Sequence, residues 1–250
     1  RYYFQFTLLD NPRAVDPKSP PAEAAIRTFR ELSARVGAER VIWRYDPIVL
    51  SDQTDVIYHV CTYQKISEAL RGYTRRSVIS VMDHYPKASR RLRSLTQEGY
   101  QLFETTKIAD VLPELIPAMV VAANQADMEI VSCAEDLDLA QFGVISGKCV
   151  DDDYIKKVFG IHVTGKKDPS QRKECGCVVS KDIGMYDSCL FGCQYCYATL
   201  SFDLARRHHA EHNPESPSLV GWYEPAQIKA QRPPEKTEKK PSQLSLFDEG

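Results

Sequence analysis

The chain has 250 residues, a formal net charge of −2 and 43% hydrophobic residues, so it is long enough for one large domain or two small ones. The nearly neutral charge gives no argument for a nucleic-acid surface. No apolar run approaches the roughly 20 residues of a membrane span, and no signal peptide precedes the first strand-like segment. Eight cysteines in clustered spacings therefore favour metal or redox chemistry in a reducing cytoplasm.

The chain begins inside an apolar segment, residues 2–9, whose aromatic and β-branched residues are typical of a strand. Because natural chains usually start with Met, and Arg1 stands here instead, we expect an N-terminal part to be missing. A proline-rich loop follows. Residues 22–36 are then predicted to form a helix, since Ile26 and Phe29 fall on one apolar face.

Strands and helices alternate over the next hundred residues. Pro113 and Pro117 make the start of the last helix uncertain, because an interior proline breaks the backbone hydrogen-bond ladder. The alternation implies a parallel sheet. Further strands are predicted at 41–50, 77–83 and 128–136, and helices at 54–71, 86–96 and 110–126.

This pattern predicts an α/β fold built from parallel βα repeats. Four strands are too few to close a barrel. With the missing N-terminal units, we expect a partial or complete TIM-like barrel. A doubly wound open sheet is the alternative.

The character of the sequence changes after residue 136. The segment 165–188 is rich in loops and is expected to need a metal to hold it. Prolines and charges dominate the chain from Asn213 onward, and such a composition cannot bury a core. We therefore expect a parallel α/β (TIM-like) region at 1–147, a cysteine-rich region at 148–222, a disordered linker at 223–242 and a tail at 243–250.

Polar residues follow the predicted strands, where parallel α/β folds gather their chemistry. A mouth lined by them suits a polar ligand, and Arg44 could bind a carboxylate through two hydrogen bonds. The alternative is that Arg44 and Asp46 form a structural ion pair at the rim. The strand-end candidates are Thr7, Arg44, Asp46, Asp83, Cys133 and Glu135, of which Arg44, Asp46, Asp83 and Glu135 are the candidate catalytic residues.

The most informative stretch runs from Cys175 to Ala198 and holds five of the eight cysteines. Within it, Cys189, Cys193 and Cys196 form a C-x3-C-x2-C motif. Three thiolates at this spacing can converge on one iron–sulfur cubane, each binding a different iron, so that the fourth iron stays open to a small molecule. The alternatives are a structural zinc site and unligated thiols.

This motif resembles the cluster-binding loop of the radical S-adenosylmethionine enzymes, which carry an aromatic residue where Tyr195 stands here. The resemblance implies that Cys189, Cys193 and Cys196 hold a 4Fe-4S cluster whose open iron chelates S-adenosylmethionine. Tyr195 could cover the cluster or the ligand. Electron transfer to the sulfonium would then cleave a C–S bond and form a 5′-deoxyadenosyl radical, which abstracts hydrogen from a substrate. In those enzymes the loop normally follows the first barrel strand, whereas here it follows the whole α/β region.

Other cysteines lie outside this motif. Cys175 and Cys177 have a chelating C-x-C spacing. Together with Cys149, and with one more ligand such as Cys133, they could hold a second iron–sulfur cluster or a zinc ion.

Cys61 and the histidines at 208–212 are expected to have structural roles, although the helical spacing of the histidines could also bind a metal. Cys61 falls in the helix predicted at 54–71 and is expected to be a small buried residue. His208 and His212 share a face of a helix predicted at 202–212, which we expect to be a solvated surface.

About residues 1–222 also resemble a bacterial family of unknown function whose C-terminal end carries a radical-enzyme-like cysteine cluster. This resemblance implies an α/β region followed by a cluster domain and supplies no reaction. The matching segments are VIWRYDPI at 41–48, SCAED at 132–136 and CGC-x2-S-x-DIG-x-Y at 175–186, followed by the three-cysteine motif.

The tail contains the pentapeptide QLSLF, residues 243–247, which includes Leu244. It resembles the short peptide by which bacterial polymerases and repair proteins bind the replication sliding clamp. Leu246 and Phe247 could enter an apolar pocket while Gln243 makes polar contacts at its rim, and the linker would let the tail reach the clamp. The alternatives are a chance pentapeptide and a tail that packs on its own domain.

Together these features predict a cytoplasmic iron–sulfur enzyme of the radical S-adenosylmethionine type, a lyase or transferase that acts in DNA maintenance or repair through the sliding clamp. A nucleic-acid substrate follows from the tail alone. One alternative is a non-catalytic DNA-maintenance adaptor whose metal is structural zinc or a redox-sensing cluster. Another is an iron–sulfur enzyme that does not use S-adenosylmethionine.

Overall fold

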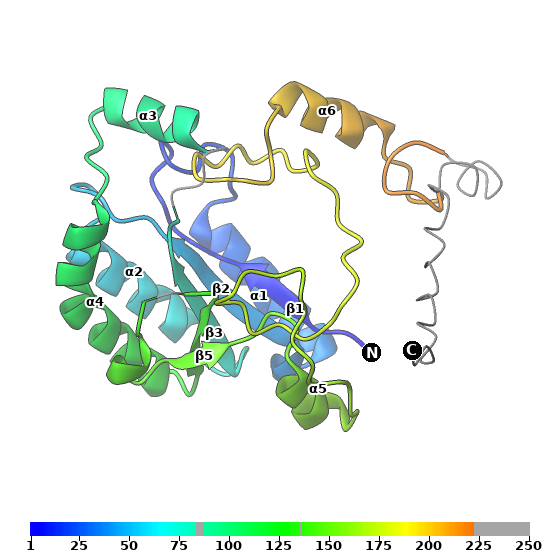
Figure 1. Ribbon diagram of the computed structural model, residues 1–250, viewed down its shortest axis with the longest axis horizontal. Helices are drawn as coiled ribbons and strands as arrows, with labels where there is room; N and C mark the ends of the chain where they lie inside the picture. The colour runs from blue at the N-terminus through cyan, green and yellow to red at the C-terminus, as the bar shows by residue number, and fades with distance from the viewer. Residues whose placement is uncertain (84–87, 136, 223–250) are drawn as a thin grey trace, which may run out of the picture.

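The computed structural model of the chain describes residues 1–83, 88–135 and 137–222. At its centre lies a sheet of five parallel strands in the order β1-β2-β3-β4-β5, so that neighbours in the sheet are also neighbours in sequence (Figure 1). The strands are β1 (Phe4–Thr7), β2 (Val41–Ile48), β3 (Arg76–Val81), β4 (Glu129–Cys133) and β5 (Ile145–Gly147).

Helices connect the strands as the alternation predicted, and the α/β class with a parallel sheet is confirmed. Within the described ranges, no helix has the length and apolar character that a membrane crossing requires. The helices are α1 (Ala22–Val36), α2 (Val56–Ala69), α3 (Ser89–Gln97), α4 (Thr105–Gln125), α5 (Asp152–Phe159) and α6 (Phe202–Glu211), with short 3-10 turns at Ala38–Arg40 and Ala140–Phe142.

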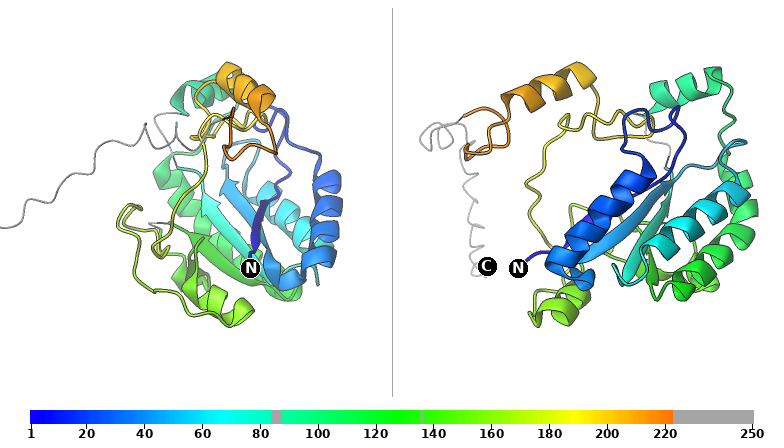
Figure 2. Two further views of the ribbon diagram at one scale, coloured as in Figure 1. Left: turned by 90° about the vertical axis from the view of Figure 1, so that its right-hand side faces the viewer. Right: turned by 180° about the vertical axis from the view of Figure 1, so that it is seen from behind.

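Helices α1, α2 and α4 cover the same face of the sheet (Figure 2). Trp43 and Tyr45 of β2 point into this layer and are fully buried. The Trp43 ring stacks on Tyr63 of α2 with ring centroids 4.7 Å apart. Because strand side chains alternate, Arg44 points to the opposite face. The sheet therefore has an apolar face under the helices and a second face that carries polar groups.

The five strands form an open sheet, so the described residues do not make a closed TIM-like barrel. A closed barrel of this type has eight strands, and five cannot complete the circle. A doubly wound sheet would need the strand order to reverse, and the five described strands run from β1 to β5 without reversal.

The short strand β5 was not predicted. It has three residues, and its Ile145 is exposed, so the segment lacks the alternation by which a strand is recognised. Gly147 lies against β4 so closely that a Cβ atom there would stand 2.6 Å from the carbonyl oxygen of Ser132. Glycine is therefore needed for β5 to pair with β4.

Helix α4 begins at Thr105, earlier than the predicted residue 110, and continues through Pro113 and Pro117. Each proline removes one backbone N–H donor and costs about 3 kcal/mol in a helix interior. Burial of one apolar face compensates, since each buried large side chain contributes about 1.5–3 kcal/mol. That face includes Ile108, Leu112, Leu115, Ile116 and Met119.

The prediction that Cys61 is buried is wrong, because its side chain is exposed. Helix α2 turns His59, Tyr63 and Ile66 toward the core. Position 61 falls between them on the outer side of the helix, since residues two apart do not share a helix face.

His59 is buried in α2 between two hydrogen-bond partners. The Tyr45 hydroxyl lies 2.8 Å from Nδ1, and the Val49 carbonyl oxygen lies 3.0 Å from Nε2. Burial lowers the pKa of His59 to about 4 from an ordinary 6.5. The unfolded chain therefore takes up this proton at a higher pH than the folded chain, and stability falls as the pH decreases from 6.5 toward 4.

We expect His59 to cost about 3 kcal/mol in the free energy of unfolding between pH 7 and pH 4, from a pKa difference of roughly 2.5 units. The measurement is urea unfolding at both pH values, for the wild-type chain and for His59→Gln. The variant should lose less stability on acidification than the wild type. Equal losses in the two chains would contradict the prediction.

Candidate functional site

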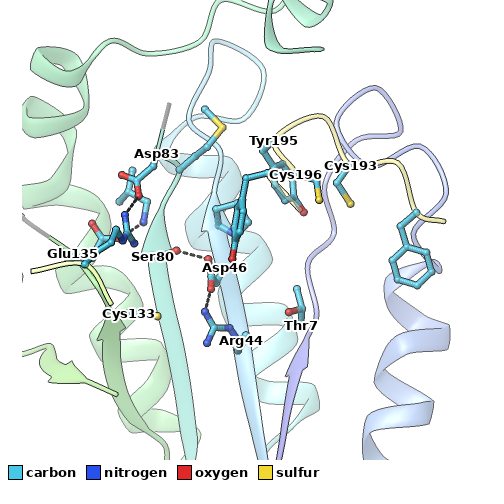
Figure 3. A pocket seen from close by; sticks show the side chains of 16 residues that line it. Thr7, Arg44, Asp46, Ser80, Asp83, Cys133, Glu135, Cys193, Tyr195 and Cys196 are labelled. Atoms are coloured by element: carbon cyan, nitrogen blue, oxygen red, sulfur yellow. Dashed lines mark hydrogen bonds and ion pairs between the residues drawn. The ribbon is translucent and has the colours of Figure 1, made fainter. Parts of the chain in front are cut away.

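A pocket of 440 Å³ opens at the carboxyl end of the sheet (Figure 3). The strand ends form one side of it, and the loop with the three-cysteine motif forms another. Parallel strands end at the same edge of a sheet, which explains why residues far apart in sequence meet there. All six strand-end candidates line the pocket: Thr7, Arg44, Asp46, Asp83, Cys133 and Glu135.

Arg44 forms an ion pair with Asp46 on the polar face of the sheet. Its Nη1 also donates hydrogen bonds to Oε1 of Gln5 at 2.5 Å and to Sγ of Cys149 at 2.9 Å. The Ser80 hydroxyl donates to the second oxygen of Asp46. Burial lowers the pKa of Arg44. The neighbouring Asp46 carboxylate and the nearby cysteines raise it by more, so the pKa lies above its ordinary value. The Arg44 guanidinium therefore has partners within the protein, which is the arrangement expected if Arg44 and Asp46 form a structural ion pair.

The other two acidic candidates also have partners. Glu135 accepts a hydrogen bond from the backbone N–H of Val81 at 2.7 Å. Asp83 forms an ion pair with Arg172, a residue that the sequence did not single out. With the Arg44–Asp46 pair of β2 included, the described residues of the pocket lining carry three carboxylates and two guanidinium groups.

Two of the three motif cysteines lie at this pocket. Figure 3 shows the side chains of Cys193 and Cys196 near each other above the ends of β1 and β2. Cys189 is exposed on the same loop. Gly192, with φ of 77°, allows the left-handed backbone turn beside Cys193. Burial, and secondly the nearby Asp16 carboxylate, raise the pKa of Cys193 to about 12.

Asp16, which the sequence did not single out, connects the proline-rich loop after β1 to the cysteine loop. Its Oδ2 accepts hydrogen bonds from Asn11 at 2.9 Å and from the Tyr195 hydroxyl at 3.3 Å. Its Oδ1 is buried and has no hydrogen-bond partner in the part of the chain that the structure describes. The backbone N–H of Gln194 donates to the carbonyl of Val15 at 3.0 Å. The two loops therefore support each other beside the cysteines.

Arg91 of α3 holds the cysteine loop through its backbone. The guanidinium donates to the carbonyl oxygens of Gln194 at 3.3 Å, of Thr199 at 3.0 Å and of Cys196. It also lies over the Phe202 ring, 5.7 Å from the centroid. Because the loop has no regular secondary structure, these donors satisfy carbonyl groups that would otherwise need water.

Replacing Arg91 by Gln is expected to loosen the cysteine loop. Hydrogen bonds from a charged donor contribute about 1.5–3 kcal/mol, which corresponds to roughly tenfold or more in the local opening equilibrium. Backbone amide hydrogen exchange of residues 194–199 should accelerate by that factor. The matched control is Arg93→Gln, an exposed residue of the same helix, which should leave the exchange unchanged. Equal exchange in both variants would refute this role of Arg91.

A second group of cysteines lies on the polar face of the sheet. The Sγ atoms of Cys133 and Cys149 are 3.2 Å apart. Sγ of Cys177 accepts hydrogen bonds from the backbone N–H groups of Cys149 at 3.1 Å and of Val150 at 3.4 Å. Cys175 is buried nearby in the C-x-C pair. The structure therefore brings Cys133, Cys149, Cys175 and Cys177 into one region, whereas Cys61 lies apart on α2.

The two thiols of the Cys133–Cys149 pair differ in pKa. A hydrogen bond from the Cys149 thiol, with Arg44 adding a smaller contribution, lowers the pKa of Cys133 to about 6. The same hydrogen bond and burial raise the pKa of Cys149. Within the pair, Cys133 is therefore the more acidic thiol.

Other candidate metal ligands have protein partners. Among the described residues, the close-set ligand group is Asp151, Asp152 and Asp153. Asp151 pairs with Arg76, and Asp152 pairs with Lys148, so these carboxylates serve in ion pairs.

His208 of α6 and His212, which follows the helix, each lie within hydrogen-bond distance of a backbone carbonyl oxygen. His208 is half-buried, and its Nδ1 lies 2.7 Å from the carbonyl oxygen of Asp187. His212 is exposed and makes a similar bond to the carbonyl of Leu219 at 2.9 Å. His212 is therefore exposed to solvent, as expected, whereas His208 is half-buried against the cysteine-rich region.

The fold and the site define an α/β protein with a cysteine-bearing loop at the carboxyl end of an open parallel sheet. Residues 1–198 match the model of a family described as a domain of unknown function, DUF1848. Because the match covers most of the chain, the chain belongs to this family. No curated protein and no solved structure matches it. The predicted membership of a family of unknown function is thus confirmed, and the match ends before the tail.

Proposed function

We propose that this chain is an iron–sulfur enzyme whose cluster is bound by Cys189, Cys193 and Cys196 beside a polar ligand pocket. The observation that carries the proposal is that Cys193 and Cys196 line the same pocket as the six strand-end residues. A purely structural metal knot does not need to face a cavity. A catalytic centre does, because its ligand must reach the metal.

The donor set suits a 4Fe-4S cluster. Three cysteine thiols on one loop can each bind a different iron, and Cys193 and Cys196 face the cavity. The exposed Cys189 lies four residues before Cys193 on the same irregular loop. When bound, such a cluster supplies one iron without a protein ligand, which is the feature that the radical S-adenosylmethionine enzymes use.

The charge of the pocket favours a ligand with a cationic group. Among the described residues of its lining, three carboxylates stand against two guanidinium groups. The aromatic rings of Tyr195 and Tyr197 add faces that attract cations. S-adenosylmethionine carries an ammonium and a sulfonium, so we propose it as the ligand. Asp46 is then the candidate for orienting it, because it lines the pocket and is held in place by two hydrogen-bond partners.

The test is anaerobic purification of the full chain, with iron and sulfide quantified, followed by electron paramagnetic resonance of the reduced protein. We expect a 4Fe-4S signal that changes when S-adenosylmethionine is added and that does not change in the same way with S-adenosylhomocysteine, which lacks the sulfonium. A cluster signal indifferent to both compounds would favour an iron–sulfur enzyme that does not use S-adenosylmethionine. Absence of iron and sulfide would leave the non-catalytic adaptor as the better proposal.

The proposed role in DNA maintenance rests on the tail, which lies outside the described residues. If QLSLF binds the sliding clamp, the double variant Leu246→Ala, Phe247→Ala should lose clamp binding in a pull-down with purified bacterial clamp. A clamp-binding motif of this size works through its two apolar anchors, so we expect affinity to fall at least about tenfold. Replacement of Glu249 by Ala is the matched control. Unchanged binding by the double variant would refute the tail assignment.

A further inference from the structure

Four cysteines from three separate segments meet on the polar face of the sheet. Cys133 ends β4 and Cys149 follows β5, and their Sγ atoms are 3.2 Å apart. Cys175 and Cys177 come from the long loop after α5 and are only 8% and 7% exposed. All four are free thiols, and none belongs to the three-cysteine motif.

The surroundings of these sulfurs offer hydrogen-bond donors. Cys177 Sγ accepts from the two successive backbone N–H groups of Cys149 and Val150. Cys149 Sγ accepts from Nη1 of Arg44 at 2.9 Å. Donors directed at sulfur favour the thiolate, which is the form that binds metals, and such outer contacts orient the ligands of metal sites. The Arg44 charge would also offset part of the negative charge that several thiolates bring together.

The backbone holds the C-x-C segment beside Cys149. The N–H of Val178 donates to the carbonyl of Val150 at 3.1 Å. A Cβ atom on Gly176 would stand 3.2 Å from Cγ of Lys148, so the segment approaches the chain after β5 closely. In the described residues, no three cysteine sulfurs lie within 4.8 Å of one another. Ion binding would therefore draw the C-x-C loop toward the Cys133–Cys149 pair.

We infer that Cys133, Cys149, Cys175 and Cys177 form a second metal site that binds a single Zn²⁺ ion. Two thiolates on one tetrahedral zinc, each about 2.3 Å from the metal, lie about 3.8 Å apart. The 3.2 Å separation of the Cys133 and Cys149 sulfurs is close to this value. In a cubane each cysteine binds a different iron, which spreads the sulfurs more widely. The ion would fix the cysteine-rich loop to the sheet, and this inference does not rest on the proposed iron–sulfur function.

The test is metal analysis of the full-length chain purified anaerobically, in four forms. We expect about one zinc per chain in the wild type, in Cys193→Ala and in the exposed-thiol control Cys61→Ala. Cys177→Ala should retain zinc at least about tenfold more weakly in a chelator titration. Iron and sulfide should follow the opposite pattern, with loss in Cys193→Ala and retention in Cys177→Ala. The two sites, and the failure of either proposal, are thereby distinguished.

Three results would overturn the inference. One is iron and sulfide that depend on Cys177, which would indicate a second cluster. Another is zinc that disappears in Cys193→Ala, which would place it in the three-cysteine motif. The third is a metal-free wild-type chain with a Cys133–Cys149 disulfide found by mass spectrometry. If Cys177→Ala does not fold, zinc X-ray absorption of the wild type decides: four sulfurs at about 2.3 Å support the site, and fewer contradict it.

Discussion

Replacing Cys193 by Ala is expected to abolish the iron–sulfur cluster. The change removes one of three proposed ligands, and that ligand is part-buried and lines the pocket. A cubane with two protein ligands leaves a second iron open and is readily lost, so the iron content should fall from about four per chain to near zero. Iron and sulfide analysis of anaerobically purified protein measures this directly.

The control for this experiment is Cys61→Ala, because Cys61 is an exposed cysteine on α2 and does not line the pocket. Its iron and sulfide contents should match those of the wild type. Circular dichroism of both variants shows whether the α/β region stays folded. If Cys193→Ala kept its iron, the assignment of the three-cysteine motif as the cluster site would be wrong.

Replacing Arg76 by Met is expected to lower the free energy of unfolding by about 3–5 kcal/mol. Arg76 of β3 is buried on the polar face of the sheet and pairs with Asp151 at 2.7 Å and with Glu129 at 2.6 Å. Its guanidinium also lies over the Tyr154 ring, 4.2 Å from the centroid. Methionine keeps much of the volume but leaves the Asp151 carboxylate buried without its partner. Urea unfolding at pH 7 gives the free energy.

A second substitution separates the charge effect from the packing effect. Asp151 caps α5 by accepting a hydrogen bond from the backbone N–H of Tyr154. Asn can make the same cap without a charge. The double variant Arg76→Met, Asp151→Asn should therefore recover a large part of the lost stability. Arg206→Met, which breaks an exposed pair with Asp203, should cost less than about 1 kcal/mol. If Arg76→Met cost no more than this control, the buried ion pair would not be what holds α5 on the sheet.

The parts of the fold that the sequence predicts are those with local, periodic patterns. Helix α1 begins and ends at the predicted residues because its apolar positions recur at helical spacing and Gly37 follows its last residue. The gathering of the strand-end residues at one pocket follows from parallel pairing alone. Strand β5 and the early start of α4 were missed, because a three-residue strand carries no pattern and because the prolines concealed a well-buried helix face.

The contacts that complete the site join residues far apart in the chain, and no local pattern indicates them. Arg91 reaches a loop more than a hundred residues later, and Asp16 reaches Tyr195. The approach of Cys133 to Cys149 depends on how β5 pairs with β4, which the sequence left open. For Arg44, two roles were open because strand register decides which side chains meet. In the structure the side chain faces Asp46 and Cys149.

Arg91 holds the cysteine loop through backbone atoms, so the loop depends more on the residue at position 91 than on the side chains that it contacts. The guanidinium contacts the carbonyl oxygens at positions 194, 196 and 199, and every amino acid supplies the same carbonyl. Natural selection can therefore replace the side chains at 194 and 199 without releasing the loop, whereas position 91 has no substitute with the same forked set of donors. Among family members, we expect arginine to be retained at position 91 while the residues at positions 194 and 199 vary. Lineages could then adjust the rim of the pocket to new ligands while the anchor stays the same.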